Sequence, residues 1–167
     1  MYRKKKDSTM NTEKIKVPVK QGLPMIAEMV KLKYITDTLE KSSGWIYNKL
    51  NSEKTTTKSK GFSQPDIDLI NKTLHEIGEK LLSMRIVSPE ADSVVETRIQ
   101  IVEQIKELSK IVCMPYIYIN KLSKNITWYK ARMSHPDRYR FKEDDLININ
   151  MSIVEIGSKL LSIELTL

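Results

Sequence analysis

The chain of 167 residues contains one segment twice, and this internal repeat limits its possible folds more than any other feature. Residues 62–86 align without a gap with residues 141–165, at an offset of 79, and share eleven identities in 25 positions. Upstream the offset is 83, and there the chain's two tryptophans, Trp45 and Trp128, take equivalent places. Copy one holds four extra residues in the loop 51–61. The sequence therefore predicts a tandem duplication of one small unit.

Each copy has the same predicted order of elements: a first helix, a pair of short helices, a polar loop and a longest helix. The longest helix repeats apolar residues such as Ile67, Ile70 and Leu74 at alternating spacings of three and four, which indicates one buried face. It also contains Gly78, and its counterpart contains Gly157, which the close approach of a neighbouring helix would explain. The expected helices of copy one are 24–30, 34–41 and 44–50. Those of copy two are 116–123 and 126–133, after a helix that enters through Ser88-Pro89-Glu90 and ends near Val112.

The positive charge is concentrated at the N-terminus. The net charge is +7, and residues 1–20 carry seven basic and two acidic side chains, whereas each remaining half has a surplus of one. We expect a basic, flexible arm at 1–20, a first unit at 21–87, and a linker helix with the second unit at 88–167. Such an arm fits contact with phosphates, but the tail by itself favours a disordered terminus that adds solubility.

Several function classes find no support in the sequence. No apolar run approaches the ~20 residues of a membrane span, and the basic start lacks the apolar stretch of a signal peptide, so we expect a cytoplasmic protein. The single Cys113 excludes an internal disulfide, and a buried apolar role is expected for it. His75 and His135 have neither a nucleophile nor a second ligand at suitable spacing, and the acidic run 143–145 opens a helix. We predict no enzyme, no cofactor and no metal site.

Two short helices joined by a turn are predicted within residues 35–50. Leu39 and Ile46 are seven residues apart, which brings the first helix onto the inner face of the second. The segment resembles the helix-turn-helix of lambda-repressor and Cro-like regulators in its small Thr36, apolar Leu39, turn at 42–44 and apolar Ile46. The matching positions of copy two are Ile119, Leu122, 125–127 and Tyr129. Glu40 and Ser123 stand in place of the family's usual turn glycine, each followed by a lysine, Lys41 and Lys124.

The resemblance implies an all-α protein of two tandem helix-turn-helix units that binds double-stranded DNA, as a bacterial or phage transcriptional regulator. The second helix of each pair would enter a major groove, where Asn can pair with adenine and Tyr or Ser can bond phosphates or bases. The implied DNA contacts are Ser43, Gly44, Tyr47, Asn48, Lys49 and Asn51 in copy one, and Asn125, Thr127, Lys130, Arg132 and Ser134 in copy two. The implied phosphate contacts are Lys4, Lys5, Lys6, Lys41, Lys58, Lys60, Lys124, Arg138 and Arg140.

A second hypothesis comes from a different class. The duplicated unit could be a protein-interaction or virion-associated helical scaffold, with a protein partner in place of DNA. The missing turn glycine and the near-neutral bodies favour this alternative, whereas the basic arm and the paired second helices favour DNA. The sequence also allows a homodimer, and it favours structural packing over base stacking for Trp45 and Trp128.

Overall fold

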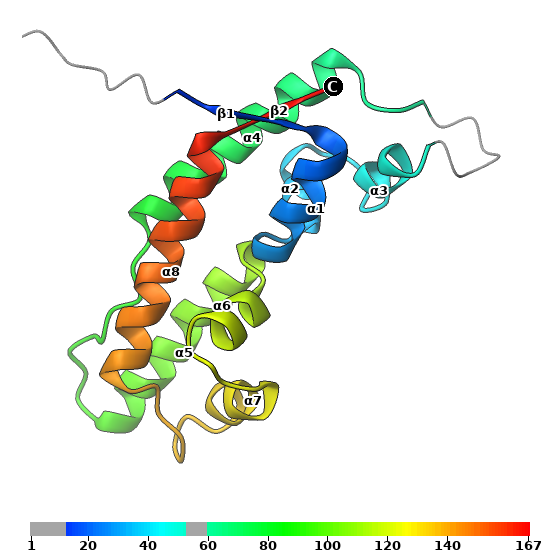
Figure 1. The fold of residues 1–167 in the computed structure, drawn as a ribbon. Helices are drawn as coiled ribbons and strands as arrows, with labels where there is room; N and C mark the ends of the chain where they lie inside the picture. Colours follow the sequence, from blue (N-terminus) through cyan, green and yellow to red (C-terminus); the bar gives the residue numbers. More distant parts are fainter. Residues whose placement is uncertain (1–12, 53–59) are drawn as a thin grey trace, which may run out of the picture.

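A computed structural model describes residues 13–52 and 60–167 (Figure 1). This part of the chain is mostly helical, as the composition predicts. The elements, in chain order, are β1 (Ile15–Pro18), α1 (Val19–Met29), α2 (Leu32–Thr38), α3 (Trp45–Leu50), α4 (Gln64–Ser83), α5 (Val94–Ile111), α6 (Met114–Asn120), α7 (Ile126–Ser134), α8 (Glu143–Ser162) and β2 (Ile163–Thr166). No helix in the described ranges is both long and apolar enough to cross a membrane.

The helices α1–α4 recur as α5–α8, so the expected repeat of elements is confirmed. The helices α4 and α8 have 20 residues each and are related by the offset of 79. The helices α2 and α6 have seven residues each and are related by an offset of 82. Trp45 opens α3, and Trp128 lies in the first turn of α7.

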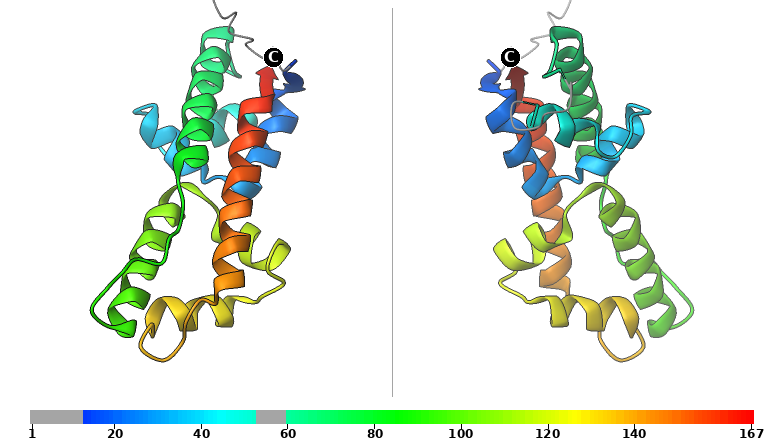
Figure 2. Two further views of the ribbon diagram at one scale, coloured as in Figure 1. Left: turned by 90° about the vertical axis from the view of Figure 1, so that its left-hand side faces the viewer. Right: turned by 90° about the vertical axis from the view of Figure 1, so that its right-hand side faces the viewer.

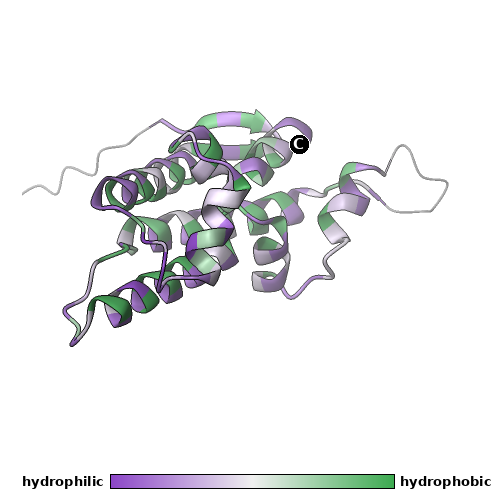
Figure 3. Cartoon of the chain, turned by 90° about the horizontal axis from the view of Figure 1, so that it is seen from below, coloured by the Kyte–Doolittle hydropathy of each residue, from purple (hydrophilic) through white to green (hydrophobic). Residues whose placement is uncertain are grey.

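The two copies share one core, in which α4 and α8 pack along each other (Figure 2). Figure 3 shows hydrophilic and hydrophobic residues alternating along the helices of the chain, as amphipathic helices require. Gly78 and Gly157 are buried where α4 meets α8. A Cβ on either glycine would stand 3.0 Å from the backbone oxygen of the other. The predicted close approach of a neighbouring helix is therefore confirmed, and its neighbour is the equivalent helix of the other copy.

Two asparagines bind the copies together in a reciprocal way. The side chain of Asn71 on α4 accepts a hydrogen bond from the amide of Leu165, at 2.8 Å, and donates one to its carbonyl, at 2.9 Å. The side chain of Asn150 on α8 makes the same two bonds with Ile86, both at 2.8 Å. Asn71 and Asn150 are equivalent at the offset of 79, and so are Ile86 and Leu165. Each copy thus holds the backbone that follows the other copy's long helix.

A third reciprocal contact joins the ends of α1 and α5. Val30 and Val112, the residues that follow these helices, form an isolated antiparallel bridge. Its flanking hydrogen bonds run from Lys31 to the carbonyl of Ile111, at 2.8 Å, and from Cys113 to the carbonyl of Met29, at 2.9 Å. Contacts that repeat when the copies are exchanged define an approximate twofold axis.

The strands β1 and β2 break this symmetry and correct two expectations. They pair in parallel, with Ile15 opposite Ile163 and Pro18 opposite Thr166, so the fold is not purely helical. The flexible arm predicted over 1–20 is wrong for residues 15–20, because β1 is held by β2 and α1 begins at the buried Val19. Residues 1–12 lie outside the described ranges.

The starts of two helices also differ from the sequence prediction. The Ser88-Pro89-Glu90 start is wrong, because residues 84–91 form no helix and α5 begins at Val94, where Ser93 accepts a hydrogen bond from Glu96. The segment is held by Gln104, whose side-chain amide bonds both backbone groups of Val87, at 2.8 and 2.9 Å. The helix α1 begins five residues before the predicted start and contains Pro24.

Candidate nucleic-acid interface

The turn between the two short helices has the same unusual backbone in both copies. Glu40 has a φ of 53° and Ser123 a φ of 54°, and no other non-glycine residue in the described ranges has a positive φ. Glycine is the residue that tolerates this left-handed region best, and Glu40 and Ser123 are the positions for which the resemblance to lambda-repressor and Cro-like turns led us to expect it. The turns close through backbone bonds from Lys41 to Thr36, at 2.9 Å, and from Lys124 to Tyr118, at 2.7 Å.

The inner positions of the helix pair are buried as predicted in copy one, but one position differs in copy two. Thr36 and Ile46 are buried at 0% and 1% exposure. Ile119, the expected counterpart of Thr36, is 54% exposed, whereas Tyr118 is buried and stacks on Tyr129 at 5.0 Å between ring centroids. The reason is one extra residue between α6 and the turn, which changes the offset from 82 to 83 within this segment.

The two tryptophans join the second helices to the long helices. The Trp45 ring meets Phe62 edge to face, at 6.0 Å and 87°, and Trp128 meets Phe141 at 5.5 Å and 83°. Both tryptophans are half-buried against the core. The structure therefore supports the packing role that the sequence analysis favoured.

Lys49, an implied DNA contact, is turned inward. Its ammonium lies 2.9 Å from the Asp66 carboxylate, 3.1 Å from the Gly61 carbonyl and 5.3 Å from the centre of the Trp45 ring. Burial of the Asp66 carboxyl opposes ionisation, but hydrogen bonds from Ser63 and Lys49 outweigh it, and the pKa of Asp66 lies below its ordinary value. Lys49 thus fixes α3 to the start of α4.

Arg132 takes the equivalent place in copy two. Its guanidinium lies 4.3 Å from the centre of the Trp128 ring and donates to the carbonyls of Arg140, at 2.8 Å, and Trp128, at 3.2 Å. Burial lowers the pKa of Arg132 from its ordinary value. Lys49 and Arg132 therefore hold the second helices in place, and their charges are engaged within the protein.

Most of the other implied DNA contacts lie at the surface. Tyr47 is 68% exposed, and Asn125 is exposed while its side chain caps α7 by accepting a 2.9 Å bond from Trp128. Gly44 and Asn51 are half-buried. The exposed members of the implied set are Ser43, Tyr47 and Asn48 in copy one, and Asn125, Thr127, Lys130 and Ser134 in copy two.

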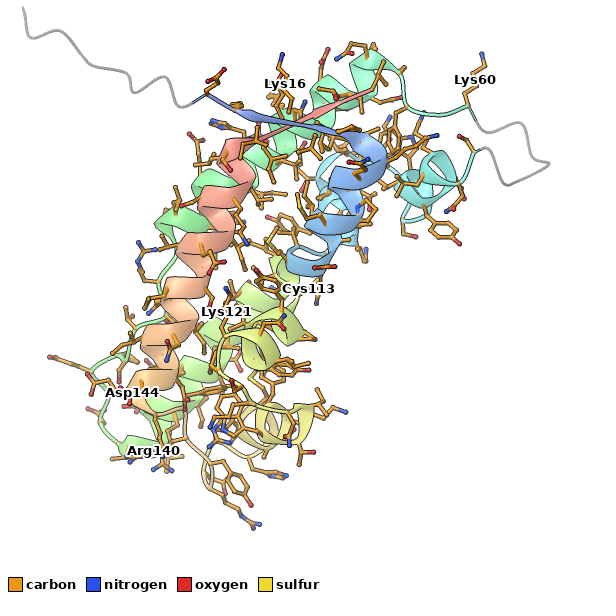
Figure 4. The ribbon with its side chains drawn as sticks, viewed as in Figure 1. Lys16, Lys60, Cys113, Lys121, Arg140 and Asp144 are labelled. Atoms are coloured by element: carbon orange, nitrogen blue, oxygen red, sulfur yellow. The ribbon has the colours of Figure 1, made fainter. Side chains whose placement is uncertain are left out.

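The implied phosphate contacts divide into three groups. Lys41 and Lys124 are exposed equivalents, each 6.0 Å from the tryptophan ring of its own copy. Lys60, Arg138 and Arg140 are exposed on the loops that follow α3 and α7. Figure 4 shows Arg140 near Asp144, at the acidic start of α8. The remaining four, Lys4, Lys5, Lys6 and Lys58, lie outside the described residues.

The two second helices lie on the same side of the molecule, away from the crossing of α4 and α8. In Figure 1 and in the right-hand view of Figure 2, α3 and α7 lie at opposite ends of this side. Figure 4 shows Cys113, next to the Val30–Val112 bridge, between them. No group of three or more His, Cys, Asp or Glu residues in the described part of the chain could hold a metal ion.

The comparisons with known proteins match one copy of this unit. Residues 19–86 match a family described as a domain of unknown function, DUF5053. This range begins at the first residue of α1 and ends at Ile86, which Asn150 binds. No curated protein and no solved structure matches the chain.

Proposed function

We propose that the protein binds double-stranded DNA in a sequence-dependent way, through α3 and α7, as a bacterial or phage transcriptional regulator. The observation that carries this proposal is the turn geometry. In both copies a left-handed residue, Glu40 or Ser123, separates two short helices at the position that resembles a helix-turn-helix glycine. The second helix then presents an exposed polar surface, on the same side of the molecule in both copies.

The proposed contact surface is smaller than the set that the sequence implied. In copy one it comprises Ser43, Tyr47 and Asn48, and in copy two Thr127 and Lys130. Lys49 and Arg132 become positioning residues, because their cationic groups are bound to carbonyl oxygens and packed on tryptophan rings. Their substitution would move the second helices rather than remove a contact.

The exposed cations beside these helices support contact with phosphates. Lys41 and Lys124 follow the two left-handed turn residues directly, so both copies place an exposed cation in the turn that precedes the second helix. A protein that neutralises phosphates releases counterions, and its affinity for DNA falls steeply as salt rises. The proposal therefore requires that the logarithm of the DNA affinity falls linearly as the logarithm of the salt concentration rises.

A titration of labelled random duplex at 50, 100 and 200 mM salt, followed by selection from a random DNA pool, tests the proposal. We expect salt-dependent binding to the random duplex and enrichment of one short sequence. The double variant Lys41→Gln/Lys124→Gln removes the two exposed turn cations, and it should reduce the slope of log affinity against log salt. Absence of binding at 50 mM salt contradicts the proposal.

One observation favours the second candidate, a helical protein-interaction scaffold. Ile147 and Met151, one turn apart on the outer side of α8, are 49% and 64% exposed. They line a cavity of about 630 Å³ that Arg85 also borders. Copy one has Asp68 and Lys72 at the equivalent positions. An apolar patch on one copy alone suits a protein partner.

The double variant Ile147→Asp/Met151→Lys introduces the residues that copy one already carries on an equivalent helix. Sedimentation of both proteins tests whether the patch mediates self-association, and the DNA titration above is repeated on each. If DNA binding is absent in both and a larger assembly dissociates in the variant, the scaffold function is favoured. Unchanged sedimentation together with intact DNA binding argues against it.

A further inference from the structure

We propose that a single chain binds an inverted pair of unlike DNA half-sites, with α3 on one and α7 on the other, without forming a dimer. This inference rests on the proposed DNA-binding function. It adds the orientation of the target, the number of chains bound, and the assignment of each half-site to one helix.

The orientation follows from the way in which the copies contact each other. Two units related by a twofold rotation make reciprocal contacts, whereas units related by translation put different surfaces together. Asn71 binds the backbone of Leu165, and its equivalent Asn150 binds the backbone of Ile86. Because equivalent residues appear on both sides of the contact, the copies are related by rotation.

Two further contacts each join a residue to its own equivalent in the other copy. Exchanging the two copies therefore leaves these contacts unchanged. Gly78 and Gly157 approach each other's backbone oxygens at the crossing of α4 and α8, and Val30 pairs with Val112. An axis through these two contacts runs from the α4–α8 crossing to the side on which α3 and α7 lie, and passes between them (Figures 1 and 4). A DNA duplex has its own twofold axes perpendicular to the helix. Two recognition helices related by such an axis read half-sites of inverted orientation.

The number of chains follows from where these contacts are made. In a homodimeric regulator, a second chain supplies the partner unit. Here the surface of α4 around Gly78 is covered by α8, and the segment that ends at Ile86 is bound by Asn150 of the same chain. The unit that matches the DUF5053 family thus already has its partner within the chain.

The half-sites are unlike because the exposed residues differ between the helices. At the offset of 83, Ser43 corresponds to Ile126, Tyr47 to Lys130 and Asn48 to Ala131. The amide of Asn48 can pair with a base edge, whereas α7 offers the exposed hydroxyl of Thr127 to a base and the charge of Lys130 to a phosphate. An inverted repeat of two identical halves therefore satisfies only one of the two helices.

The test starts from the sequence that selection yields and compares five duplexes of equal length. They carry the selected site, the same site with one half reversed, each half in a perfect palindrome, and the two halves separated by five additional base pairs. Affinity is measured for each, and native mass spectrometry gives the number of chains bound. We expect one chain per duplex and a loss of about tenfold or more for the reversed and the lengthened sites, since half-sites must lie about one DNA turn apart on one face.

The assignment of the halves is tested with Asn48→Ala and a scrambled α3 half-site. The variant should bind the selected site about tenfold more weakly, and should lose less than the unsubstituted protein when the α3 half is scrambled, since only Ser43 and Tyr47 remain to contact that half. Scrambling the α7 half should weaken both proteins equally. Equal affinity for the reversed site, or two chains per selected site, overturns this inference while DNA binding itself stands. A protein that binds no duplex at low salt overturns the proposed function and this inference together.

Discussion

Gly78 and Gly157 lie against each other where α4 meets α8, and each occupies the space into which a side chain of the other would project. A Cβ on Gly78 would stand 2.9 Å from Cγ of Leu161, and one on Gly157 would stand 3.2 Å from Cγ of Leu82. Leu82 and Leu161 are themselves equivalent at the offset of 79. The two helices can approach this closely because neither carries a side chain at the contact.

Alanine at either glycine should therefore destabilise the fold. Alanine is the better helix former by about 1 kcal/mol, but overpacking a close contact costs about 1–3 kcal/mol. We expect Gly78→Ala and Gly157→Ala each to lower the free energy of unfolding by up to about 2 kcal/mol, the difference between these two terms, and by similar amounts because the contact is symmetric. Urea denaturation followed by circular dichroism measures this. Gly61→Ala is the control, since its Cβ would have an ordinary contact with Ser52 at 3.4 Å. A gain in stability for either helical variant contradicts the close approach.

The Asp66–Lys49 pair should make stability depend on pH. The pKa of Asp66 is lowered in the folded protein, so the pair stabilises the fold above the unfolded pKa of about 3.9, and this contribution is lost as pH falls through the folded value. Asp66→Asn should cost about 1 kcal/mol at pH 7, the net value of a typical hydrogen bond. The difference from the unsubstituted protein should shrink below pH 4. Asp68→Asn, on the exposed face of the same helix, is the control. A difference that persists at pH 2 would show that the ion pair is not its cause.

The two second helices should contribute differently to DNA recognition. Asn48→Ala should relax specificity at a few base pairs, at a cost of roughly 1–3 kcal/mol if the amide pairs with a base. Lys130→Ala should weaken binding to all sequences by similar factors, because its charge contacts phosphates without reading bases. Anisotropy titrations on the selected site and on a scrambled duplex separate the two patterns. No change with either substitution would favour the scaffold function.

The basic arm should contribute to affinity but not to specificity. Deleting residues 1–20 would also remove β1 and the start of α1, so the informative deletion is 1–12, which carries four basic side chains and one acidic one. We expect this deletion to reduce the salt slope of binding by about one to three units, with unchanged preference between sequences. The melting temperature serves as a control for folding. An unchanged slope would mean that the arm makes no contact with DNA.

Much of the fold could be predicted because the repeat and the apolar periodicity are local signals. The offset of 79 is enough to locate α4 and α8 and to show that Gly78 and Gly157 are equivalent, whereas their contact with each other is seen only in the structure. The start of α5 was mispredicted because Ser88 and Pro89 are a good local start, whereas Asn150 on α8 and Gln104 further along α5 hold the backbone beside them. The strands β1 and β2 could not be predicted, since four residues pair there only through contacts between the two ends of the chain.

The candidate interface was predicted less completely. Exposed polar residues such as Tyr47 and Asn48 follow from their place on the helix opposite the buried Ile46. The inward orientation of Lys49 and Arg132 depends on the tryptophan rings and on carbonyls of the following loop, which spacing alone does not bring together. A signal was present nonetheless: a cation four residues after each tryptophan, in both copies.

The twofold arrangement inside one polypeptide changes what a mutation can do. In a symmetric homodimer every substitution occurs twice, once in each subunit, so a residue that suits one half must also suit the other. Here one copy can change alone, and the outer faces of the two long helices differ: Ile147 and Met151 on α8 stand where α4 has Asp68 and Lys72. The contacts that join the copies, made by Asn71, Asn150, Gly78 and Gly157, are the same on both sides. A chain built in this way can acquire a new surface on one half while the other retains the old one, a route that is closed to two identical subunits.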